Sequence, residues 1–505
     1  MVSGSSRARR CIVGVAVFGV IVLGLAATTS CGRATPPPPV SAAPTVTAPA
    51  AALPVVPDGD FTAVAQLVED AIAAPRMPGA VVQVGHAGNI VFRQAFGSRK
   101  LVGEPGLDGA PAPAEPMTED TIFDLASITK SLATATAVLQ LAEQGKVAID
   151  DPLQTYLPEF NPGGDPRRAQ VTLRMLLTHT SGLAGDLSMD GPWGLVEADK
   201  AEGIRRALNA RMDFGPGELF HYSDIGFILL GAMIEKITGE AEDVFVQRAV
   251  FEPLGMTDTR YLPAAKACGP HKIIGTAMSF DTSAPRVDTC PAGSWSTDLL
   301  ARIAPTARDE DTPGVNPNID HLLRGTVHDP TARRMGGVAG SAGVFSTVRD
   351  LGLFAQALLD RLAGRPSAFP LTQASVELMT TPQQPGHHAG QLAAANGAVR
   401  EATATTPNPP DPLLAPNYPA IPGQDLRGFG WDIDTALSRP RGVIFPVSSF
   451  GQGGFTGVTL WIDPASNTYV IVLANVIHQR GGPPIVTLSG DVATETARAL
   501  RLYGN

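Results

Sequence analysis

The chain has 505 residues, of which 44% are hydrophobic and 17% are charged. A chain of this length and composition can bury a large core, so it is expected to be globular. Its formal net charge is −10, and it has no long basic stripe of the kind that neutralises a phosphate backbone. These features argue against nucleic acid as a partner and favour a small substrate.

Residues 1–31 are predicted to be a signal peptide. Three arginines precede an apolar run over residues 11–27, which is typical of a secretory signal and is short for a membrane span of about 20 residues. Residues 26–31 resemble a bacterial lipoprotein cleavage site with Cys31 as the lipidated residue, except that Thr28 stands where that motif usually has Leu. Simple secretion and an uncleaved anchor remain as alternatives. Each alternative exports the protein, and the lipidated form would be anchored at the outer face of the cell membrane.

Residues 32–58 are predicted to be a linker, because they are rich in Pro, Ala, Thr and Val and include four consecutive prolines at 36–39. Such a stretch tends to an extended polyproline structure and cannot bury a core. The folded domain is therefore expected over residues 59–505.

The chain contains four cysteines, of which Cys11 and Cys31 lie in the signal segment. The remaining two, Cys268 and Cys290, are expected to form one disulfide in an exported protein, worth about 3 kcal/mol of stability. No Cys-x-x-Cys or His-x-x-x-His cluster accompanies them. No metal site and no cofactor are therefore expected.

Hydrophobic periodicity predicts regular elements at both ends of the domain. The predicted elements are a helix over 61–74, strands over 80–84, 90–94, 458–462 and 469–473, and a helix over 486–502. The middle of the chain is predicted to be mostly helical with long loops. The expected fold is therefore α+β, with an antiparallel sheet from the two terminal parts, flanked by helices, and a mainly helical region inserted between them. Residues 381–423 are predicted to be a surface loop or lid.

A Ser-x-x-Lys sequence, Ser127 to Lys130, opens one of the predicted helices. Residues three apart share a helix face, so Lys130 is expected beside Ser127, where a lysine with a lowered pKa can activate a serine hydroxyl. Free N–H groups at a helix start also favour an oxyanion. By itself the pattern fits equally well a helix N-cap with a nearby surface lysine.

Two later segments add candidate groups. Tyr222 lies at a predicted junction between a loop and a helix, where its hydroxyl could relay protons. The glycine-rich residues 450–457 precede a predicted strand, and glycines let a substrate approach the backbone closely. The edge of that strand could supply a second oxyanion donor.

Together these segments resemble the serine β-lactamase and penicillin-binding-protein superfamily, nearest its class C β-lactamase, D-alanyl-D-alanine carboxypeptidase and esterase branch. The resemblance covers the chain from about Phe61 to the C-terminus, and it implies a β-lactamase/transpeptidase-like fold. Besides Ser127–Lys130 and Tyr222–Asp224, the matching segments are Pro78–Ala80, Leu176–Leu183, Phe251–Met256, Val327–Pro330, Gly336–Gly343 and Gly428–Trp431.

The resemblance also implies catalytic roles. Ser127 would be acylated, Lys130 would accept its proton, and Tyr222 would act as a base or acid in acylation and deacylation. The backbone N–H groups of Ser127 and Phe455 would form the oxyanion hole.

The expected substrate-binding residues are Asp224, Gln452, Gly453 and Gly454, and three of them depart from the family pattern. Gln452 stands where relatives have Lys or His, Gly453 stands where a hydroxyl residue is usual, and Asp224 replaces an Asn. Gln452 has no charge with which to hold a substrate carboxylate. Ester hydrolysis is therefore expected to exceed β-lactam hydrolysis, unless an arginine such as Arg427 or Arg480 compensates.

Other conspicuous residues are interpreted as structural. His179 is expected to fix a loop, and Phe429 and Trp431 to form a pocket wall or core. His328, Asp329 and Ser341 could form a second catalytic triad, an alternative that the resemblance disfavours.

Three functions remain open from the sequence. The first is a serine hydrolase acting on esters or on amides such as cell-wall peptides or β-lactams, with an esterase or D-alanyl-D-alanine carboxypeptidase-like activity favoured. The second is a catalytically silent penicillin-binding-like protein that binds cell-wall fragments, and the third is a surface lipoprotein that serves as a scaffold. Ser127, Lys130 and Tyr222 together favour the first, because a binding module needs no such set.

Overall fold

A computed structural model of the chain describes residues 58–281, 283, 289–388, 390–405, 425–479 and 487–504. The predicted signal peptide, Cys31 and Arg480 therefore lie outside the described residues. Within the described ranges, no helix is both long enough and apolar enough to cross a membrane.

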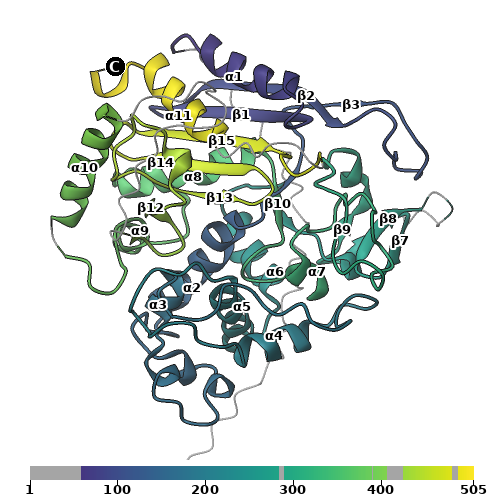
Figure 1. Cartoon of the computed structure of the whole chain (residues 1–505), viewed down its shortest axis with the longest axis horizontal. Coiled ribbons are helices and arrows are strands. Elements are labelled where there is room, and N and C mark those ends of the chain that lie inside the picture. Colours follow the sequence, from purple (N-terminus) through teal and green to yellow (C-terminus); the bar gives the residue numbers. More distant parts are fainter. Residues whose placement is uncertain are drawn as a thin grey trace, which may run out of the picture. The chain divides into compact units, whose positions relative to one another are not determined.

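An eight-stranded sheet joins the two ends of the folded domain (Figure 1). Its strands, in spatial order, are β11 (Leu426–Arg427), β12 (Asp432–Asp434), β13 (Phe450–Gly454), β14 (Val458–Asp463), β15 (Thr468–Ala474), β1 (Gly79–His86), β2 (Asn89–Lys100) and β3 (Glu115–Pro116). All neighbouring strands are antiparallel. The N-terminal strand β1 pairs along its length with the C-terminal β15, from Ala80 opposite Ala474 to His86 opposite Thr468.

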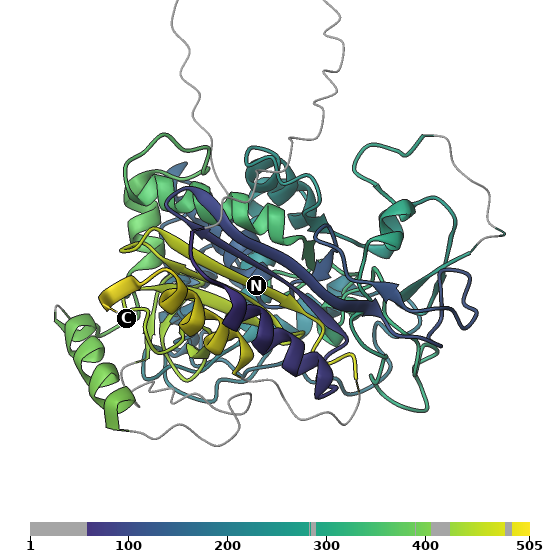
Figure 2. The ribbon, with the colours of Figure 1, turned by 90° about the horizontal axis from the view of Figure 1, so that it is seen from above.

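The two faces of this sheet are covered by different helices. Successive side chains of a strand point to opposite faces, so Val82 and Val84 of β1 join the small core under α1 (Thr62–Ala73) and α11 (Leu488–Ala499), whereas Val81 joins the main core. Figure 2 shows α1 and α11 side by side on the first face. Helix α8 (Val348–Leu362) packs against β1 and β15 from the main-core side.

The middle of the chain supplies the helical region. Its helices are η1 (Lys130–Ala135), α2 (Thr136–Glu143), α3 (Leu173–Leu177), α4 (Lys200–Leu208), α5 (Asp224–Thr238), α6 (Glu242–Val246), η5 (Gln247–Phe251), α7 (Pro330–Arg334) and α9 (Gln373–Thr380). Helix α5 begins where Ser223 accepts the Gly226 N–H and ends at Gly239, whose left-handed backbone (φ 71°) closes it. The predicted α+β fold, with a terminal sheet and an inserted helical region, is confirmed.

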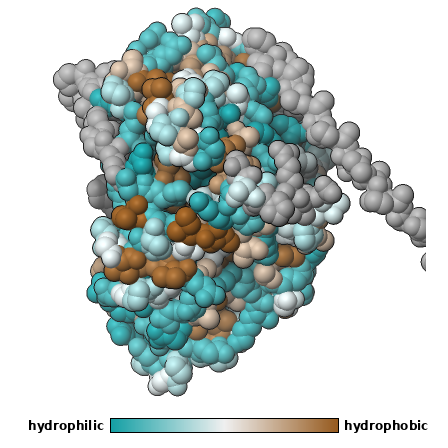
Figure 3. Space-filling view, turned by 90° about the vertical axis from the view of Figure 1, so that its right-hand side faces the viewer, coloured by the Kyte–Doolittle hydropathy of each residue, from teal (hydrophilic) through white to brown (hydrophobic). Residues whose placement is uncertain are grey.

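A disulfide closes one loop beside the helical region. It joins Cys268, the last residue of β6 (Ala267–Cys268), to Cys290, with the two Cα atoms 5.6 Å apart. The loop includes the hairpin β7 (His271–Ile274) and β8 (Ala277–Phe280), on which Ile273 and Ile274 are exposed. Figure 3, which views the side of the molecule on the right in Figure 1, shows apolar side chains at the surface.

Candidate active site

The predicted nucleophile lies in a tight turn after β4 (Phe123–Asp124). Ala126, which directly precedes Ser127, has φ 45°, a conformation that favours glycine and is strained for alanine. The buried Asp124 carboxylate holds the turn, because its Oδ1 accepts the Ala126 N–H at 2.9 Å and its Oδ2 accepts the His328 N–H at 2.7 Å. Burial raises the pKa of Asp124 to about 6, although both backbone hydrogen bonds favour its charged form.

Lys130 lies at the start of η1, a wide π-helical turn, and its side chain is buried. Its Nζ donates to Ser127 Oγ at 3.0 Å and to the Ser341 carbonyl at 2.8 Å, and it lies 2.7 Å from Asp224 Oδ1. Two N–H groups of the ammonium are thus donated to Ser127 and Ser341, and the Asp224 carboxylate forms an ion pair with it. The predicted Ser127–Lys130 pair is therefore brought together, with Asp224 as a close third member.

The charge state of Lys130 follows from these contacts. Burial alone would lower the pKa of Lys130, but the Asp224 carboxylate, together with Tyr222, raises the pKa above its usual value. Lys130 is therefore an ammonium group at neutral pH.

Tyr222 lies over the lysine, with Nζ of Lys130 5.2 Å from the centre of its ring. The Tyr222 ring stacks on the buried His179 ring at a centroid distance of 4.2 Å, and His179 Nδ1 accepts the Ser223 N–H at 3.0 Å. Burial, and after it the positive charge of Arg427, holds the pKa of His179 well below its usual range. His179 is therefore neutral, and it positions Tyr222 in addition to fixing the loop.

Strand β13 brings Gln452 to the same centre. Gln452 Nε2 lies 3.4 Å from the Tyr222 hydroxyl and donates to the Gly453 carbonyl at 3.2 Å. Gly454 is required by packing, because a Cβ there would lie 2.6 Å from the Leu125 carbonyl oxygen. The glycine-rich strand therefore approaches the turn that carries the predicted nucleophile.

The two predicted oxyanion donors are free to bind. Neither the Ser127 N–H nor the Phe455 N–H donates a hydrogen bond to any residue that the structure describes. The turn after β13 is tied to the nucleophile segment, because Thr456 Oγ1 donates to the Asp124 carbonyl at 2.9 Å. The Phe455 side chain is 73% exposed and stacks on the His328 ring at 5.9 Å.

Two acidic residues at this centre were not among the sequence candidates for the main site. The Asp224 N–H donates to the Gly185 carbonyl at 2.8 Å, which brings the loop with Asp186 to the start of α5. Burial, and after it the Asp224 carboxylate, raises the pKa of Asp186 and raises the pKa of Asp329 to about 6. No motif singled out Asp186, and Asp329 was given a possible role only in the second triad, although it lies in the matching segment Val327–Pro330.

The structure gives no support to that second triad. The Ser341 hydroxyl is buried and, among the described residues, has no hydrogen-bond partner. Asp329 caps α7 by accepting the Ala332 N–H at 2.7 Å, and the His328 ring stacks on Phe455. Ser341 contributes its carbonyl to Lys130 instead.

Arg427, considered as a compensating cation, is fully buried and lies 3.3 Å from Asp432. Its guanidinium packs over the Phe220 ring. It is therefore not exposed to an incoming substrate. Trp431 and Phe429 are also buried, and they belong to the main core.

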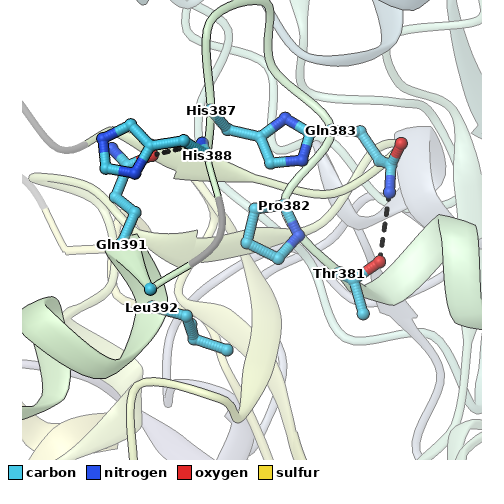
Figure 4. A pocket seen from close by; sticks show the side chains of 8 residues that line it. Thr381, Pro382, Gln383, His387, His388, Gln391 and Leu392 are labelled. Atoms are coloured by element: carbon cyan, nitrogen blue, oxygen red, sulfur yellow. Dashed lines mark hydrogen bonds between the residues drawn. The ribbon is translucent and has the colours of Figure 1, made fainter.

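A separate surface pocket of about 330 Å³ lies between α9 and α10 (Gln391–Thr405), within the predicted excursion over residues 381–423 (Figure 4). Its lining residues are Thr381, Pro382, Gln383, His387, His388, Gly390, Gln391 and Leu392. None of them is a predicted site residue, so the pocket does not contain the candidate nucleophile. The role of this segment as a lid stays a prediction.

No group of three or more His, Cys, Asp or Glu side chains within the described ranges is arranged to hold a metal ion.

Comparisons with known proteins identify the family of this chain. The model of the Beta-lactamase family matches residues 64–483. A Bacillus subtilis (strain 168) protein named "N-acetylmuramyl-L-alanine amidase" is 29% identical over 426 residues, covering 82% of this chain and 80% of that protein. An Escherichia coli (strain K12) protein named "Putative D-alanyl-D-alanine carboxypeptidase" is 27% identical over 409 residues, covering 78% and 77%.

Solved structures share the fold. Unliganded simvastatin synthase (LovD) from Aspergillus terreus has a TM-score of 0.55 at 22% identity, covering 87% of this chain and 99% of that chain. The octameric penicillin-binding protein homologue from Pyrococcus abyssi has a TM-score of 0.52 at 19% identity, covering 88% and 78%. Because the family match spans most of the sequence, this chain belongs to the Beta-lactamase family.

Proposed function

We propose that the chain is a serine hydrolase that cleaves an ester or amide bond through an acyl-enzyme on Ser127. The observation that carries the proposal is the contact of Ser127 Oγ with Lys130 Nζ at 3.0 Å, with that ammonium held 2.7 Å from Asp224. A surface lysine beside a helix cap would not be buried in this way. Relatives named for carboxypeptidase and amidase activity support a hydrolase.

The proton path follows from the charge of Lys130. Because Asp224 keeps Lys130 protonated, the Lys130 ammonium orients Ser127 Oγ and stabilises Tyr222 as a phenolate, and this phenolate accepts the Ser127 proton. Ser127 Oγ then bonds to the substrate carbonyl carbon, and the developing oxyanion binds to the N–H groups of Ser127 and Phe455. Tyr222 returns the proton to the leaving group as the ester or amide bond breaks. A water molecule, deprotonated by Tyr222, hydrolyses the acyl-enzyme.

We propose an esterase or D-alanyl-D-alanine carboxypeptidase-like activity rather than efficient β-lactam hydrolysis. Gln452 can donate a hydrogen bond but supplies no charge to a substrate carboxylate, and a charge-assisted hydrogen bond is about twice as strong as a neutral one. Arg427 is buried beside Asp432 and does not replace the missing cation. The alternative, a catalytically silent protein that binds cell-wall fragments, is tested by the same labelling experiment.

The test is covalent labelling with a fluorophosphonate probe. Wild type is expected to be labelled and to hydrolyse a chromogenic short-chain ester, whereas Ser127→Ala should lose both activities and retain its thermal unfolding transition. Ser188→Ala, which removes an exposed hydroxyl elsewhere, is the matched control and should be labelled normally. Equal labelling of wild type and Ser127→Ala would reject Ser127 as the nucleophile. A folded but unlabelled wild type that binds cell-wall fragments would support the silent alternative.

We further propose that the protein is exported and held by lipid on Cys31 at the outer face of the cell membrane. The Cys268–Cys290 disulfide supports export, because disulfides persist in oxidising compartments. Cell fractionation of wild type and Cys31→Ser tests the anchor. Equal recovery of both in the membrane fraction would contradict it.

A further inference from the structure

An exposed aromatic side chain lies directly beside the predicted oxyanion hole. Phe455 is 73% exposed, and it is the only phenylalanine or tryptophan that is exposed in the part of the chain that the structure describes. Its own backbone N–H is one of the two predicted oxyanion donors. The Phe455 ring therefore lies within one residue of the position that the substrate carbonyl oxygen would occupy, where an apolar group of the substrate can cover it.

The Phe455 ring is held in one place by the chain beneath it. It stacks on the His328 ring at a centroid distance of 5.9 Å, with 19° between the two planes. The His328 N–H donates to Asp124 Oδ2 at 2.7 Å, and Thr456 Oγ1 donates to the Asp124 carbonyl at 2.9 Å. Burial, and after it the positive charge of Arg333, lowers the pKa of His328 to about 4. At neutral pH the two rings therefore form a fixed, uncharged aromatic surface, and the face of Phe455 away from His328 is open.

The order of residues along β13 indicates which part of a substrate would meet this surface. Gln452 lies at the Tyr222 end of the site, with Nε2 3.4 Å from the Tyr222 hydroxyl. Phe455 follows three residues later, about 10 Å further at the spacing of a strand. Strand β12 pairs with β13 only at Gly451, so a substrate can lie along the edge of β13 beyond this point.

The direction of the substrate follows from the proposed proton path. Tyr222 delivers a proton to the leaving group, so the leaving group must lie at the Tyr222 end of β13. The carbonyl oxygen binds between the N–H groups of Ser127 and Phe455. The acyl group therefore extends away from Tyr222, toward the Phe455 ring.

We propose that Phe455 and His328 form an acyl-binding subsite that selects substrates whose acyl group carries an uncharged aromatic ring, such as arylalkanoyl esters or amides. The substrate ring would stack on the open face of Phe455, and His328 would be a positioning residue that holds the Phe455 ring from below. A stacked aromatic pair contributes about two- to tenfold in affinity beyond its buried apolar area. This inference rests on the proposed hydrolase function and names the acyl group of its substrate.

The experiment compares ethyl 3-phenylpropanoate with ethyl 3-cyclohexylpropanoate. The two esters share an aliphatic leaving group and have rings of similar size, but only the first ring is aromatic. The released acid is measured by chromatography, and each kcat/KM is divided by the rate constant for hydrolysis of the same ester by hydroxide. Wild type is expected to give a normalised kcat/KM about three- to tenfold higher for the phenyl ester. A wild-type ratio of one or less would overturn the inference.

The variants assign the preference to the aromatic pair. Phe455→Leu keeps the backbone N–H and an apolar side chain, and it should bring the ratio close to one. His328→Ala keeps the N–H that binds Asp124, and it should lower the ratio because Phe455 loses its support. Tyr503→Leu makes the same kind of change at an aromatic residue that is 45% exposed near the C-terminus, so it is the matched control and should keep the wild-type ratio. An unchanged ratio in Phe455→Leu or in His328→Ala would overturn the pair as the subsite.

The outcome also separates this inference from the proposed function. Hydrolysis of both esters together with labelling of Ser127, but without a preference for the phenyl ester, would overturn the inference alone. Absence of hydrolysis of both esters together with an unlabelled Ser127 would overturn both.

Discussion

Asp224→Asn should shift the acidic limb of the kcat/KM profile to lower pH. The change removes a negative charge 2.7 Å from Lys130 Nζ, and both side chains are largely buried. Coulomb's law with an effective dielectric constant of about 20 gives about 6 kcal/mol at that distance, equivalent to about four pKa units. The Asn side chain still accepts a hydrogen bond, and Asp186 and Asp329 remain nearby, so we expect a smaller shift of roughly two units.

The sign of this shift does not depend on which group accepts the Ser127 proton. If Lys130 accepts the proton, loss of the Asp224 charge lowers the pKa of Lys130, and the acidic limb moves to lower pH. If Tyr222 accepts the proton, the Lys130 ammonium, no longer neutralised by Asp224, stabilises the Tyr222 phenolate more strongly. The acidic limb therefore again moves to lower pH.

The assay is hydrolysis of a neutral chromogenic ester between pH 5 and 10, with thermal unfolding at each pH to confirm that the variant is folded. Asp190→Asn serves as the control for loss of an acidic side chain outside the centre, and its profile should match that of wild type. A folded Asp224→Asn with an unchanged limb would show that Asp224 and the proton acceptor are not neighbours, which would refute the interpretation of the site.

Three further predictions address charge, the disulfide and the nucleophile turn. Below pH 6.5, where the new histidine is mostly protonated and can pair with a carboxylate, Gln452→His should raise kcat/KM for a penicillin up to about tenfold relative to a neutral ester. Efficient penicillin turnover by wild type, or no selective gain in the variant, would contradict this prediction. Peptide mass mapping without reductant should recover Cys268 and Cys290 as a linked pair, and replacing both with serine should lower the free energy of unfolding by about 3 kcal/mol; recovery of two free thiols from exported protein would refute the pairing. Asp124→Asn should lower kcat at least tenfold at pH 7.5 with little change in KM, because an amide cannot accept both the Ala126 and the His328 N–H groups. Wild type should lose kcat similarly as the pH falls through about 6, where Asp124 becomes protonated. An Asp124→Asn enzyme with normal kcat would show that the turn does not need the carboxylate.

The strands of the main sheet could be predicted because their signal is local. The predicted strands over 80–84 and 469–473 lie inside β1 and β15, and the predicted terminal helix over 486–502 contains α11. A short, nearly continuous run of apolar residues was sufficient for these strands, since both faces of the sheet are covered. The prediction that both ends of the chain contribute to one antiparallel sheet is confirmed, and the structure adds that β1 pairs with β15.

The electrostatics of the site could be predicted only in part. The Ser127–Lys130 pair was expected from its spacing, whereas Asp224 was expected only as a substrate-binding residue that replaces an Asn. Asp186 gives no local signal, and it reaches the centre only because the Gly185 carbonyl accepts the Asp224 N–H. The π-helical geometry of η1 and the strained Ala126 backbone also could not be predicted, because a 3.6-residue period does not reveal them.

Two departures from the family pattern both make the charge of the candidate active site more negative. Gln452 in place of Lys or His removes a positive charge from the centre, and Asp224 in place of Asn adds a negative one. Together they make the centre two unit charges more negative than that of a relative with Lys and Asn at these positions. A substrate carboxylate would therefore lose an attractive partner and gain a repulsive one, while an ammonium would gain from both changes. In the structure the Asp224 carboxylate lies 2.7 Å from Lys130 Nζ, and the buried Arg427 lies beside Asp432. A site evolved for penicillin-like anions would be expected to have the opposite balance of charge.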